Sequence, residues 1–383
     1  MQVLIIRNAD LILHPSFNRT ISSFVNYNKT ESKKIKKIIV VNRKRNQFNR
    51  KLICDEYTKD EIKYTIFSVS TIDKTKFDKL LDLIFFKKKI KCIYKKYRET
   101  LDLVYAVDLD TTGFLSKKMI KNNIPYIHHI ADYYSDSRIT RYFSQSSSIY
   151  KYFSKKEREV MEGSTKTIIC SEARIEQIQP YFKNNVEVIH NSPIISNTFE
   201  KKAHLKYEND NISIGYVGSL SNERFILELL ELCLSKGYKL EIAGFGPLEE
   251  TVMNLSEKHN EIHYFGKIKY TDALNLYSNV DYIWGVYDPN GCNTSFAAPN
   301  KFYESLYLEK PLIALNGTSV DKLVEKYKTG IVVPNYKNLC KLDLFQISEN
   351  DYYGWRNNCA VIYPEFSWET QNEKLKNIYK ELF

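Results

Sequence analysis

The sequence of 383 residues predicts an α/β protein made of two Rossmann-like, doubly wound domains, and three observations lead to this prediction. The chain is longer than one hydrophobic core usually serves, so two domains of ordinary size are expected. Short apolar runs rich in β-branched residues alternate with helix-length segments, which is the rhythm of a parallel sheet with crossover helices. The runs are continuously apolar, as in strands that helices cover on both faces.

The first half contains six runs of this kind, and a polar stretch follows them. The runs are VLII (3–6), KIIVVN (37–42), LDLVYAVD (101–108), PYIHHIAD (125–132), TKTIICS (165–171) and VEVIHN (186–191). After Asn191-Ser192-Pro193 the chain becomes polar through EKKAHLKYENDN (200–211). This change of composition indicates a linker between two domains.

A second series of predicted strands follows the linker. Its members are ISIGYVGSL (212–220), YKLEIAG (238–244), IHYFGKI (262–268), VDYIWGVY (280–287), KPLIAL (310–315) and GIVVP (330–334). The last segment, FSWETQNEKLKNIYKELF (366–383), places Leu375, Ile378, Tyr379 and Leu382 on one face of a helix. Two tandem sheets and a terminal amphipathic helix are therefore expected.

The composition is that of an ordinary globular protein, with 43% hydrophobic and 27% charged residues. The longest apolar stretches, such as 80–86, are far shorter than the roughly 20 residues that span a bilayer. The N-terminus has no basic region ahead of its apolar run, so we expect a buried strand, no signal peptide and a cytoplasmic protein. Seven cysteines are scattered singly without a Cys-x-x-Cys pair, which favours reduced thiols and predicts no metal site.

The net charge of +10 is unevenly distributed. Residues 1–100 hold 24 Lys and Arg against 10 Asp and Glu, whereas the remainder holds 32 against 36. A positive field confined to one region suggests an anionic partner, namely a membrane surface, a pyrophosphate-bearing substrate or nucleic acid. The segment 78–99 combines Leu80, Leu81, Ile84 and Phe85 with Lys88, Lys91 and Lys95, as in a helix that lies in a bilayer interface. The alternative is that its apolar residues pack on the sheet and its lysines are solvated.

Two glycine-bearing turns follow strands of the second series. In GYVGSLSNER (215–224), Gly215 and Gly218 flank a strand end and Arg224 begins a helix. Such a turn brings backbone N–H groups close to a pyrophosphate, and an arginine there can bind its oxygens. In AGFGPLEE (243–250), Gly244 and Gly246 follow the next strand. Each turn alone is equally well explained by packing or by a tight bend.

The stretch NTSFAAPNKFYESLYLEKPLIAL (293–315) carries the strongest signal. Pro299 can start a helix on which Lys301 and Glu304 lie three residues apart on one face. The carboxylate of Glu304 could accept hydrogen bonds from ribose hydroxyls, and Lys301 with free N–H groups could bind phosphates. The alternative is an exposed ion pair of little energetic value.

In the first half, IPYIHHIADYYSDSR (124–138) places His128, His129 and Asp132 at a strand end. A histidine can exchange a proton with a sugar hydroxyl near neutral pH, and an aspartate can orient it. Because adjacent residues of a strand point to opposite faces, at most one histidine is expected to face a cleft. The other is expected to be a hydrogen-bonded core residue.

The ordered set GYVGSL, AGFGPLEE, HYFGKIKYTDALNLYSNVDYIWGV, APNKFYESLYLEKPLIA, TGIVV and FSWETQNEKL resembles the C-terminal domain of glycosyltransferase family 4. It covers roughly residues 212–383. The first half is similar more loosely through RNADLILHPSFNRTISSF, YIHHIADYYSD, IICSEARIEQI and VEVIHNSP. The resemblance implies a GT-B fold with a nucleoside diphosphate sugar in the interdomain cleft, retention of anomeric configuration and no obligatory metal. The implied parts are an acceptor-binding domain at 1–198, a nucleotide-sugar-binding domain at 199–364 and a helix at 365–383 that packs back on the first domain.

The resemblance also implies site residues. In the family the glutamate at the position of Glu304 holds the ribose, and basic residues at the position of Arg224 bind the diphosphate. We expect the donor to contact Gly218, Ser219, Arg224, Gly244, Phe245, Gly246, Ile268, Ala298, Asn300, Lys301 and Glu304. On the acceptor side we expect catalytic roles for His129 and Asp132, and acceptor contacts from Asn8, His14 and Arg138.

Three positions depart from the family pattern. The first of the family's paired glutamates falls at Phe296, so the usual carboxylate at the donor sugar is missing. The family's His-Asp pair appears as Ala131-Asp132, with His129 two places earlier. Asn8, Ala9 and Asp10 replace the usual glycine-rich first loop.

The sequence therefore predicts transfer of a sugar from a UDP- or GDP-type donor to a hydroxyl of a glycan, lipid-linked and on the cytoplasmic side of a membrane, in surface polysaccharide synthesis. We expect no cofactor and no nucleic-acid partner, and attachment of the basic N-terminal domain to an anionic membrane. Two alternatives stay open, because fold alone does not fix function. They are a nucleotide-sugar epimerase of the same fold and a catalytically silent binding subunit.

Overall fold

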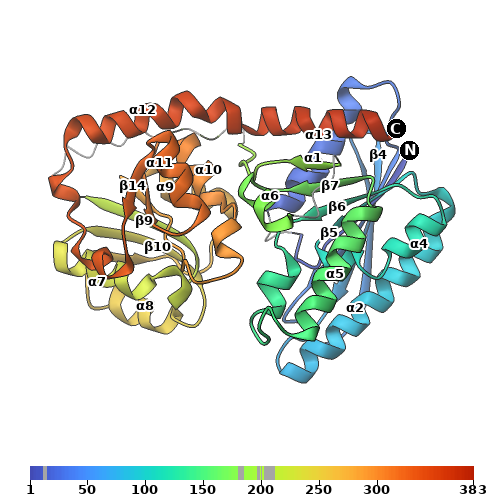
Figure 1. Cartoon of the computed structure of the whole chain (residues 1–383), viewed down its shortest axis with the longest axis horizontal. Coiled ribbons are helices and arrows are strands. Elements are labelled where there is room, and N and C mark those ends of the chain that lie inside the picture. The colour runs from blue at the N-terminus through green and yellow to red at the C-terminus, as the bar shows by residue number, and fades with distance from the viewer. Residues whose placement is uncertain (12–14, 180–184, 196–198, 200, 202–211) are drawn as a thin grey trace. The chain divides into compact units, whose positions relative to one another are not determined.

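The computed structural model describes residues 1–11, 15–179, 185–195, 199, 201 and 212–383 (Figure 1). These residues form two compact units. The N-terminal unit comprises Met1–His190 and Gln371–Phe383, and the C-terminal unit comprises Asn191–Thr370. Most of the polar stretch 200–211, where a linker was expected, lies outside the described residues.

The N-terminal unit is built on an eight-stranded sheet in the order β3-β4-β2-β1-β5-β6-β7-β8. Its strands are β1 (Gln2–Ile6), β2 (Lys37–Lys44), β3 (Leu52–Lys59), β4 (Ile62–Ser70), β5 (Leu103–Val107), β6 (Tyr126–Ile130), β7 (Lys166–Ile169) and β8 (Val186–Val188). All neighbouring strands are parallel except β3 and β4. The six predicted strands are thus present, and each is covered by helices as expected.

The hairpin of β3 and β4 was not predicted, and the doubly wound sheet has an antiparallel edge in consequence. Asp60 and Glu61 form its two-residue turn with positive φ angles of 50° and 61°. Such turns match the twist of paired strands. The outer strand β3 is mostly exposed, so its sequence lacks the continuous apolar run on which the strand predictions were based.

Helices cover both faces of this sheet (Figure 1). They are α1 (Pro15–Thr30), α2 (Lys76–Tyr97), α3 (Leu109–Thr112), α4 (Ser116–Lys121), α5 (Ser148–Gly163), α6 (Ala173–Ile178) and α13 (Trp368–Leu382), together with a π-helical turn at Ser135–Ile139. Phe86, Ile90 and Ile93 of α2 are buried in a core with strand residues such as Leu4 and Val104. The middle of α2 is therefore a core helix.

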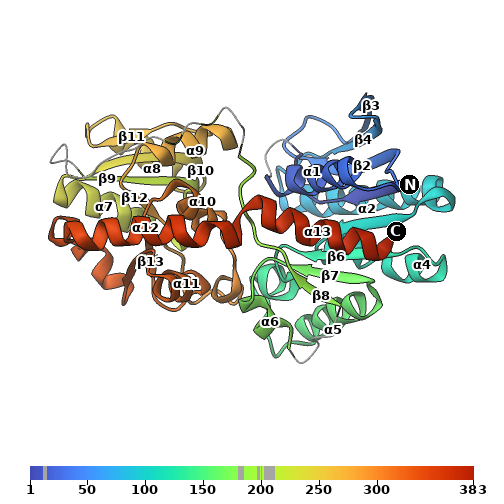
Figure 2. The same cartoon turned by 90° about the horizontal axis from the view of Figure 1, so that it is seen from above.

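The predicted C-terminal helix is α13, and it packs on the N-terminal unit beside α1 (Figure 2). The ring of Tyr379 stacks on Phe24 with centroids 4.3 Å apart. Its hydroxyl group forms a 2.8 Å hydrogen bond with the Ser23 hydroxyl group. Leu375, Ile378 and Tyr379 are buried, as their spacing predicted.

The C-terminal unit has a six-stranded, all-parallel sheet in the order β11-β10-β9-β12-β13-β14. Its strands are β9 (Ser213–Ser219), β10 (Lys239–Phe245), β11 (Ile262–Tyr264), β12 (Tyr282–Trp284), β13 (Leu312–Leu315) and β14 (Gly330–Val333). Its helices are α7 (Ile226–Lys236), α8 (Glu249–Ser256), α9 (Tyr270–Ser278), α10 (Asn300–Leu308), α11 (Ser319–Tyr327) and α12 (Glu349–Phe366). All six strands of the second predicted series are present.

Both sheets reverse their strand order at one point, between β1 and β5 in the N-terminal unit and between β9 and β12 in the C-terminal unit. Open parallel sheets bind ligands beyond the carboxyl ends of the strands at such a point. The two places to examine for function are therefore the residues that follow these four strands. Within the described part of the chain, no helix has the length and apolar character needed to cross a bilayer.

Candidate functional site

Two glycines allow the ends of β9 and β10 to approach closely. Gly244 pairs with Gly218 and has a φ angle of 144°, which side chains other than hydrogen rarely allow. A Cβ atom on Gly244 would collide with the Gly218 carbonyl group, and one on Gly246 would collide with the Leu220 carbonyl group. Glycine at these positions is therefore required for the close packing of the segments that end β9 and β10.

Two cations meet at the reversal point between β9 and β12. The Arg224 guanidinium group lies over the ring of Tyr287, 4.2 Å from its centroid. The Lys301 ammonium group lies 4.6 Å from the centroid of Tyr216 and 5.9 Å from that of Tyr287. Aromatic faces attract cations, so Tyr287, which follows β12, holds both side chains in place. Neither tyrosine was among the predicted site residues.

No carboxylate of a described residue forms an ion pair or a hydrogen bond with these two cations, although Glu304 lies near Lys301. The Nη1 atom of Arg224 is buried and makes no hydrogen bond. Lys301 is buried, and no hydrogen bond or ion pair with a described residue holds its Nζ atom. Burial lowers the pKa of Lys301 to about 8, Glu304 acts to raise it and Arg224 acts to lower it further. A buried donor without a partner costs about 1–3 kcal/mol, so an anion bound here would be strongly favoured.

Glu304 lies beside these cations on α10 and is also buried. It acts to raise the pKa of Tyr277, which burial already raises well above its ordinary value. Pro299 occupies the N-cap of α10, and the helix begins at Asn300. The structure thus places a buried carboxylate and a buried ammonium group in the first turns of one helix, which contradicts the alternative of an exposed ion pair.

The remaining predicted donor residues differ in their exposure and contacts. Phe245 is exposed, with the Lys267 ammonium group 5.3 Å from its ring centroid. Ala298 is buried, and its carbonyl group accepts a 2.9 Å hydrogen bond from Asn191. Ser219 is exposed, whereas Ile268, Asn300 and Phe296 are half-buried. In the described structure, no recorded contact joins Phe245 or Ile268 to Arg224 or Lys301.

In the N-terminal unit, both histidines of β6 are buried. His128 forms a 3.0 Å hydrogen bond with Thr112, and His129 forms a 2.7 Å hydrogen bond with the Tyr105 hydroxyl group, each through Nδ1. Burial lowers the pKa of His128 to about 3 and, with nearby arginines, that of His129 well below its ordinary value. Both are therefore neutral at pH 7, and His129 can act as a hydrogen-bond partner more readily than as a proton acceptor.

Asp132 follows β6 and keeps nearly half of its side chain exposed. Its carboxylate lies 3.4 Å from the guanidinium group of Arg174, which also donates a 2.8 Å hydrogen bond to the Ala131 carbonyl group. Arg174 is fully buried and donates to Cys170 as well. A guanidinium group that contacts Cys170, Gln177, Ala131 and Asp132 fixes the backbone at the predicted Ala131-Asp132 pair.

A group of carboxylates that the sequence reasoning missed lies beyond β5. Asp108 has a φ angle of 64° and accepts hydrogen bonds from the backbone of Ala131 and Asp132. Burial, with the charges of Asp110 and Asp132, raises the pKa of Asp108 to about 7, while Arg7 acts to lower it. The position of Asp108 at the end of the predicted strand 101–108 was a signal in the sequence, whereas its positive φ angle is visible only in the structure.

The predicted acceptor residues Asn8 and Arg138 lie close to these carboxylates. Asn8 donates a 2.5 Å hydrogen bond to Asp110 and accepts one of 3.2 Å from Arg43. Arg138, on the π-helical turn, is exposed and acts to lower the pKa of Asp110, which burial raises. The structure thus brings Asn8, Arg138 and Asp132 to the same carboxyl edge of the sheet. His14 lies outside the described residues.

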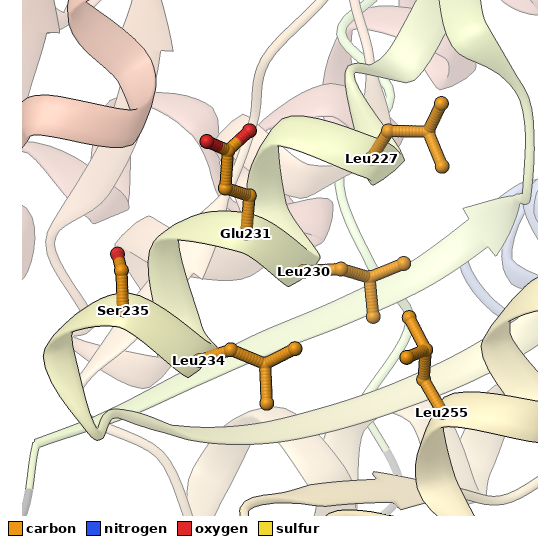
Figure 3. Close-up of a pocket in the computed structure, with 6 residues that line it drawn as sticks. All are labelled: Leu227, Leu230, Glu231, Leu234, Ser235 and Leu255. Carbon is orange, nitrogen blue, oxygen red and sulfur yellow. The ribbon is translucent and has the colours of Figure 1, made fainter.

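The C-terminal unit also has a hollow of about 480 Å³ on the outer faces of α7 and α8. In Figure 3 the side chains of Leu230, Leu234 and Leu255 point toward one another, whereas Glu231 and Ser235 point away. The lining also includes Leu227 and contains no predicted site residue. This apolar hollow is therefore separate from the cations of Arg224 and Lys301.

Comparison with solved structures decides the fold. Sucrose-phosphate synthase from Thermosynechococcus elongatus aligns over 100% of this chain and 99% of that chain, with a TM-score of 0.69 and 15% identity. HepE from Anabaena, solved in complex with UDP, aligns over 99% of both chains with a TM-score of 0.64 and 13% identity. The chain has the GT-B fold. At these identities the likeness concerns the fold alone.

The sequence had predicted the GT-B fold. A second comparison, of amino-acid sequences, finds a similar glycosyltransferase. The chain is 29% identical over 150 residues to the capsular polysaccharide biosynthesis glycosyltransferase CapM of Staphylococcus aureus. The match covers 36% of this chain and only 36% of the length of CapM. No protein-family model matches the chain.

Proposed function

We propose that this GT-B protein is a glycosyltransferase that moves a sugar from a nucleoside diphosphate sugar to a hydroxyl group of a glycan acceptor in polysaccharide synthesis. The half-buried Arg224 and the buried Lys301 carry the proposal, because they lie at the sheet's reversal point and no carboxylate of a described residue forms an ion pair with either. The similarity to CapM supports the reaction class, and the UDP complexes of HepE support the donor class.

In this proposal the diphosphate of the donor occupies the space beside Tyr287. Arg224 binds its oxygens as a fork, and Lys301 adds a second positive charge. Gly218, Gly244 and Gly246 let the ends of β9 and β10 pack closely beside the diphosphate. Glu304 accepts hydrogen bonds from the ribose hydroxyl groups. As the bond to the sugar breaks, negative charge grows on the leaving diphosphate, and two preorganised cations in a dry site stabilise it.

The N-terminal unit would bind the acceptor beyond β1, β5 and β6. Asn8, Arg138 and Asp132 are the contacts proposed there, with His129 as a neutral hydrogen-bond partner. We further propose retention of anomeric configuration, no requirement for a metal ion and a lipid-linked acceptor on the cytoplasmic side of a membrane. These finer assignments follow from the resemblance to glycosyltransferase family 4.

Attachment to an anionic membrane through the basic N-terminal unit belongs to the same proposal. One exposed stripe of α2 carries apolar residues in its first half and lysines in its second. It consists of Phe77, Leu80, Ile84, Lys88, Lys91 and Lys95. Their spacing of three or four residues places them on one face of the helix. Lysines near an anionic surface contribute about 1 kcal/mol each, and exposed apolar residues beside them can enter the interface.

A thermal-shift screen with UDP-, GDP- and CDP-linked sugars tests the proposal directly. A ligand present at 100 times its dissociation constant stabilises the folded state by about 2.7 kcal/mol. We expect stabilisation by one nucleotide class and release of free nucleotide when a suitable acceptor is added. Stabilisation without turnover would favour a silent binding subunit, and release of an epimerised sugar nucleotide would favour an epimerase. No shift with any of the three classes would contradict the proposal.

A further inference from the structure

A second exposed apolar surface lies in the N-terminal unit, outside the segment that the sequence singled out. The segment 141–152 connects the π-helical turn to the first turns of α5 and is called here the aromatic segment. Tyr142 is 78% exposed and Tyr152 is 63% exposed, and Phe143 and Ile149 are each 41% exposed. Four large apolar side chains exposed within twelve consecutive residues are a candidate interaction surface.

The aromatic segment is held in a fixed conformation. Asp136, which is buried, accepts a 2.7 Å hydrogen bond from the Tyr150 hydroxyl group and a 3.3 Å bond from Gln145. It also accepts a 2.7 Å bond from Gln177. The Ser147 hydroxyl group accepts the backbone N–H of Tyr150 and so caps α5. Phe153 contacts Tyr134, which anchors this turn of α5. The neighbouring Tyr152 is therefore exposed on a helix that is held in place.

The charge of this surface has one sign. From Ser137 to Lys156 the sequence contains five Arg and Lys residues and no Asp or Glu. Arg141, Lys151 and Lys155 are exposed within it. Aromatic rings mixed with cations are typical of surfaces that sit at the headgroup level of an anionic bilayer. A neutral glycan would have no need of this charge.

The aromatic segment lies at the same edge of the sheet as the exposed apolar residues of α2. Because β2, β4 and β6 are parallel, the residues that follow them emerge at one edge. Phe48, which follows β2, is 98% exposed, and Phe77 near the start of α2 is 68% exposed. Arg50 ties these two regions together through ion pairs of 2.8 Å to Asp78 and 2.6 Å to Asp82. Figure 1 shows the lower ends of α2 and α5 at this edge.

We propose that the aromatic segment enters the interface of an anionic phospholipid bilayer, together with Phe48 and the first turns of α2. This inference deepens the membrane attachment proposed above and rests on it. It adds that the carboxyl edge of the N-terminal sheet faces the membrane, with Asn8, Asp132 and Arg138 beside the surface. An acceptor anchored in the bilayer would then meet these residues without leaving the membrane.

Vesicle binding of the full chain tests the proposal. The probes are phosphatidylcholine vesicles with and without phosphatidylglycerol, and the variants are Tyr142→Ser with Phe143→Ser, and Arg141→Gln with Lys151→Gln. We expect the aromatic pair to weaken binding to phosphatidylglycerol vesicles at least about tenfold, and each lost cation about fivefold. The matched control is Ile120→Ser with Lys117→Gln, because these residues of α4 are exposed at the opposite edge of the same sheet.

The outcomes separate this proposal from the proposed function. All variants should keep their affinity for nucleotide, since the donor residues lie in the other unit. Loss of vesicle binding in the aromatic variant, with the control unchanged, supports the proposal. Binding that survives in the aromatic variant but is lost in a Lys88→Gln and Lys91→Gln variant would restrict attachment to α2 and overturn it. Absence of vesicle binding by the unmodified protein would overturn both membrane proposals and leave the glycosyltransferase assignment standing.

Discussion

The two units gather charged side chains at the same place, beyond the strands where their sheets reverse order, but they balance those charges differently. In the N-terminal unit, Asp108 and Asp110 lie near Arg7 and Arg138, and Asn8 bridges Asp110 and Arg43. In the C-terminal unit, the charged groups of Arg224 and Lys301 both lie over the ring of Tyr287. No carboxylate of a described residue forms an ion pair with either of them.

This difference indicates which of the two sites needs an anionic ligand to neutralise its charge. A buried cation without a partner costs free energy in the unbound protein, and that cost is recovered when an anion binds. A cluster whose charges are already compensated gains little from an added charge and can instead position a neutral hydroxyl group. The contrast therefore supports the proposal that the charged diphosphate binds to the C-terminal unit and the sugar acceptor to the N-terminal unit.

The largest expected effect concerns the uncompensated cations. Arg224→Ala and Glu304→Ala should each weaken nucleotide binding roughly ten- to a hundredfold, because each removes a charge-assisted hydrogen bond of about 1.5–3 kcal/mol. Calorimetric titration with the nucleotide selected by thermal shift measures this loss. Lys239→Ala is the matched control, since Lys239 is an exposed cation at the opposite edge of the same sheet. Unchanged affinity in both site variants would defeat the donor assignment.

The second prediction tests the compensated cluster through stability. The pKa of Asp108 is raised to about 7 in the folded state, so the folded protein binds more protons than the unfolded chain between about pH 4 and pH 7. Stability is therefore lost as the pH rises through this window. Asp108→Asn removes the penalty, tolerates the positive φ angle and should stabilise the protein about 2 kcal/mol more at pH 8 than at pH 5.

Chemical denaturation of the variant and the unmodified protein at the two pH values measures this difference. Asp102→Asn serves as the control, because Asp102 is exposed at the opposite end of β5. An equal effect of Asp108→Asn at both pH values would show that the pKa of Asp108 is not raised in the folded state, and that Arg7 and the backbone donors offset burial and the neighbouring carboxylates.

The third prediction separates acceptor handling from donor binding. His129→Asn should lower turnover by about tenfold or more and leave nucleotide affinity unchanged, because His129 lies in the N-terminal unit. His128→Asn is the matched variant, since His128 is the neighbouring buried histidine on the same strand. If only His128→Asn lowers turnover, the two roles are exchanged, and if neither does, acceptor chemistry lies elsewhere in the cluster.

The smallest expected effect is a pH dependence of donor binding. Because the pKa of Lys301 is lowered to about 8, its positive charge is lost as the pH rises through that value. Nucleotide affinity should fall by up to about tenfold between pH 7 and pH 9. Lys301→Arg keeps its charge over this range and should remove the dependence. A profile that is identical for both proteins would place the titrating group elsewhere.

The sequence by itself determined the class of fold and indicated the residues of the proposed donor site. Continuous apolar runs identified the strands of both sheets, since a strand covered on both faces must be apolar at every position. The glycines and the Pro-x-Lys-x-x-Glu run at 299–304 pointed to donor residues because their spacing along one helix is a local property. The exposed strand β3 was not predicted, because its sequence lacks such an apolar run.

Only the tertiary structure decided which charges are paired. Tyr287 follows a strand without any motif of its own, yet its ring lies beneath both Arg224 and Lys301. Asp108 looked like the ordinary end of a strand, but its left-handed backbone and its neighbours raise its pKa. The exposure of the aromatic segment was likewise visible only in the structure, because it depends on which residues pack around the segment. Burial and compensation arise from residues distant in sequence, so no local pattern reports them.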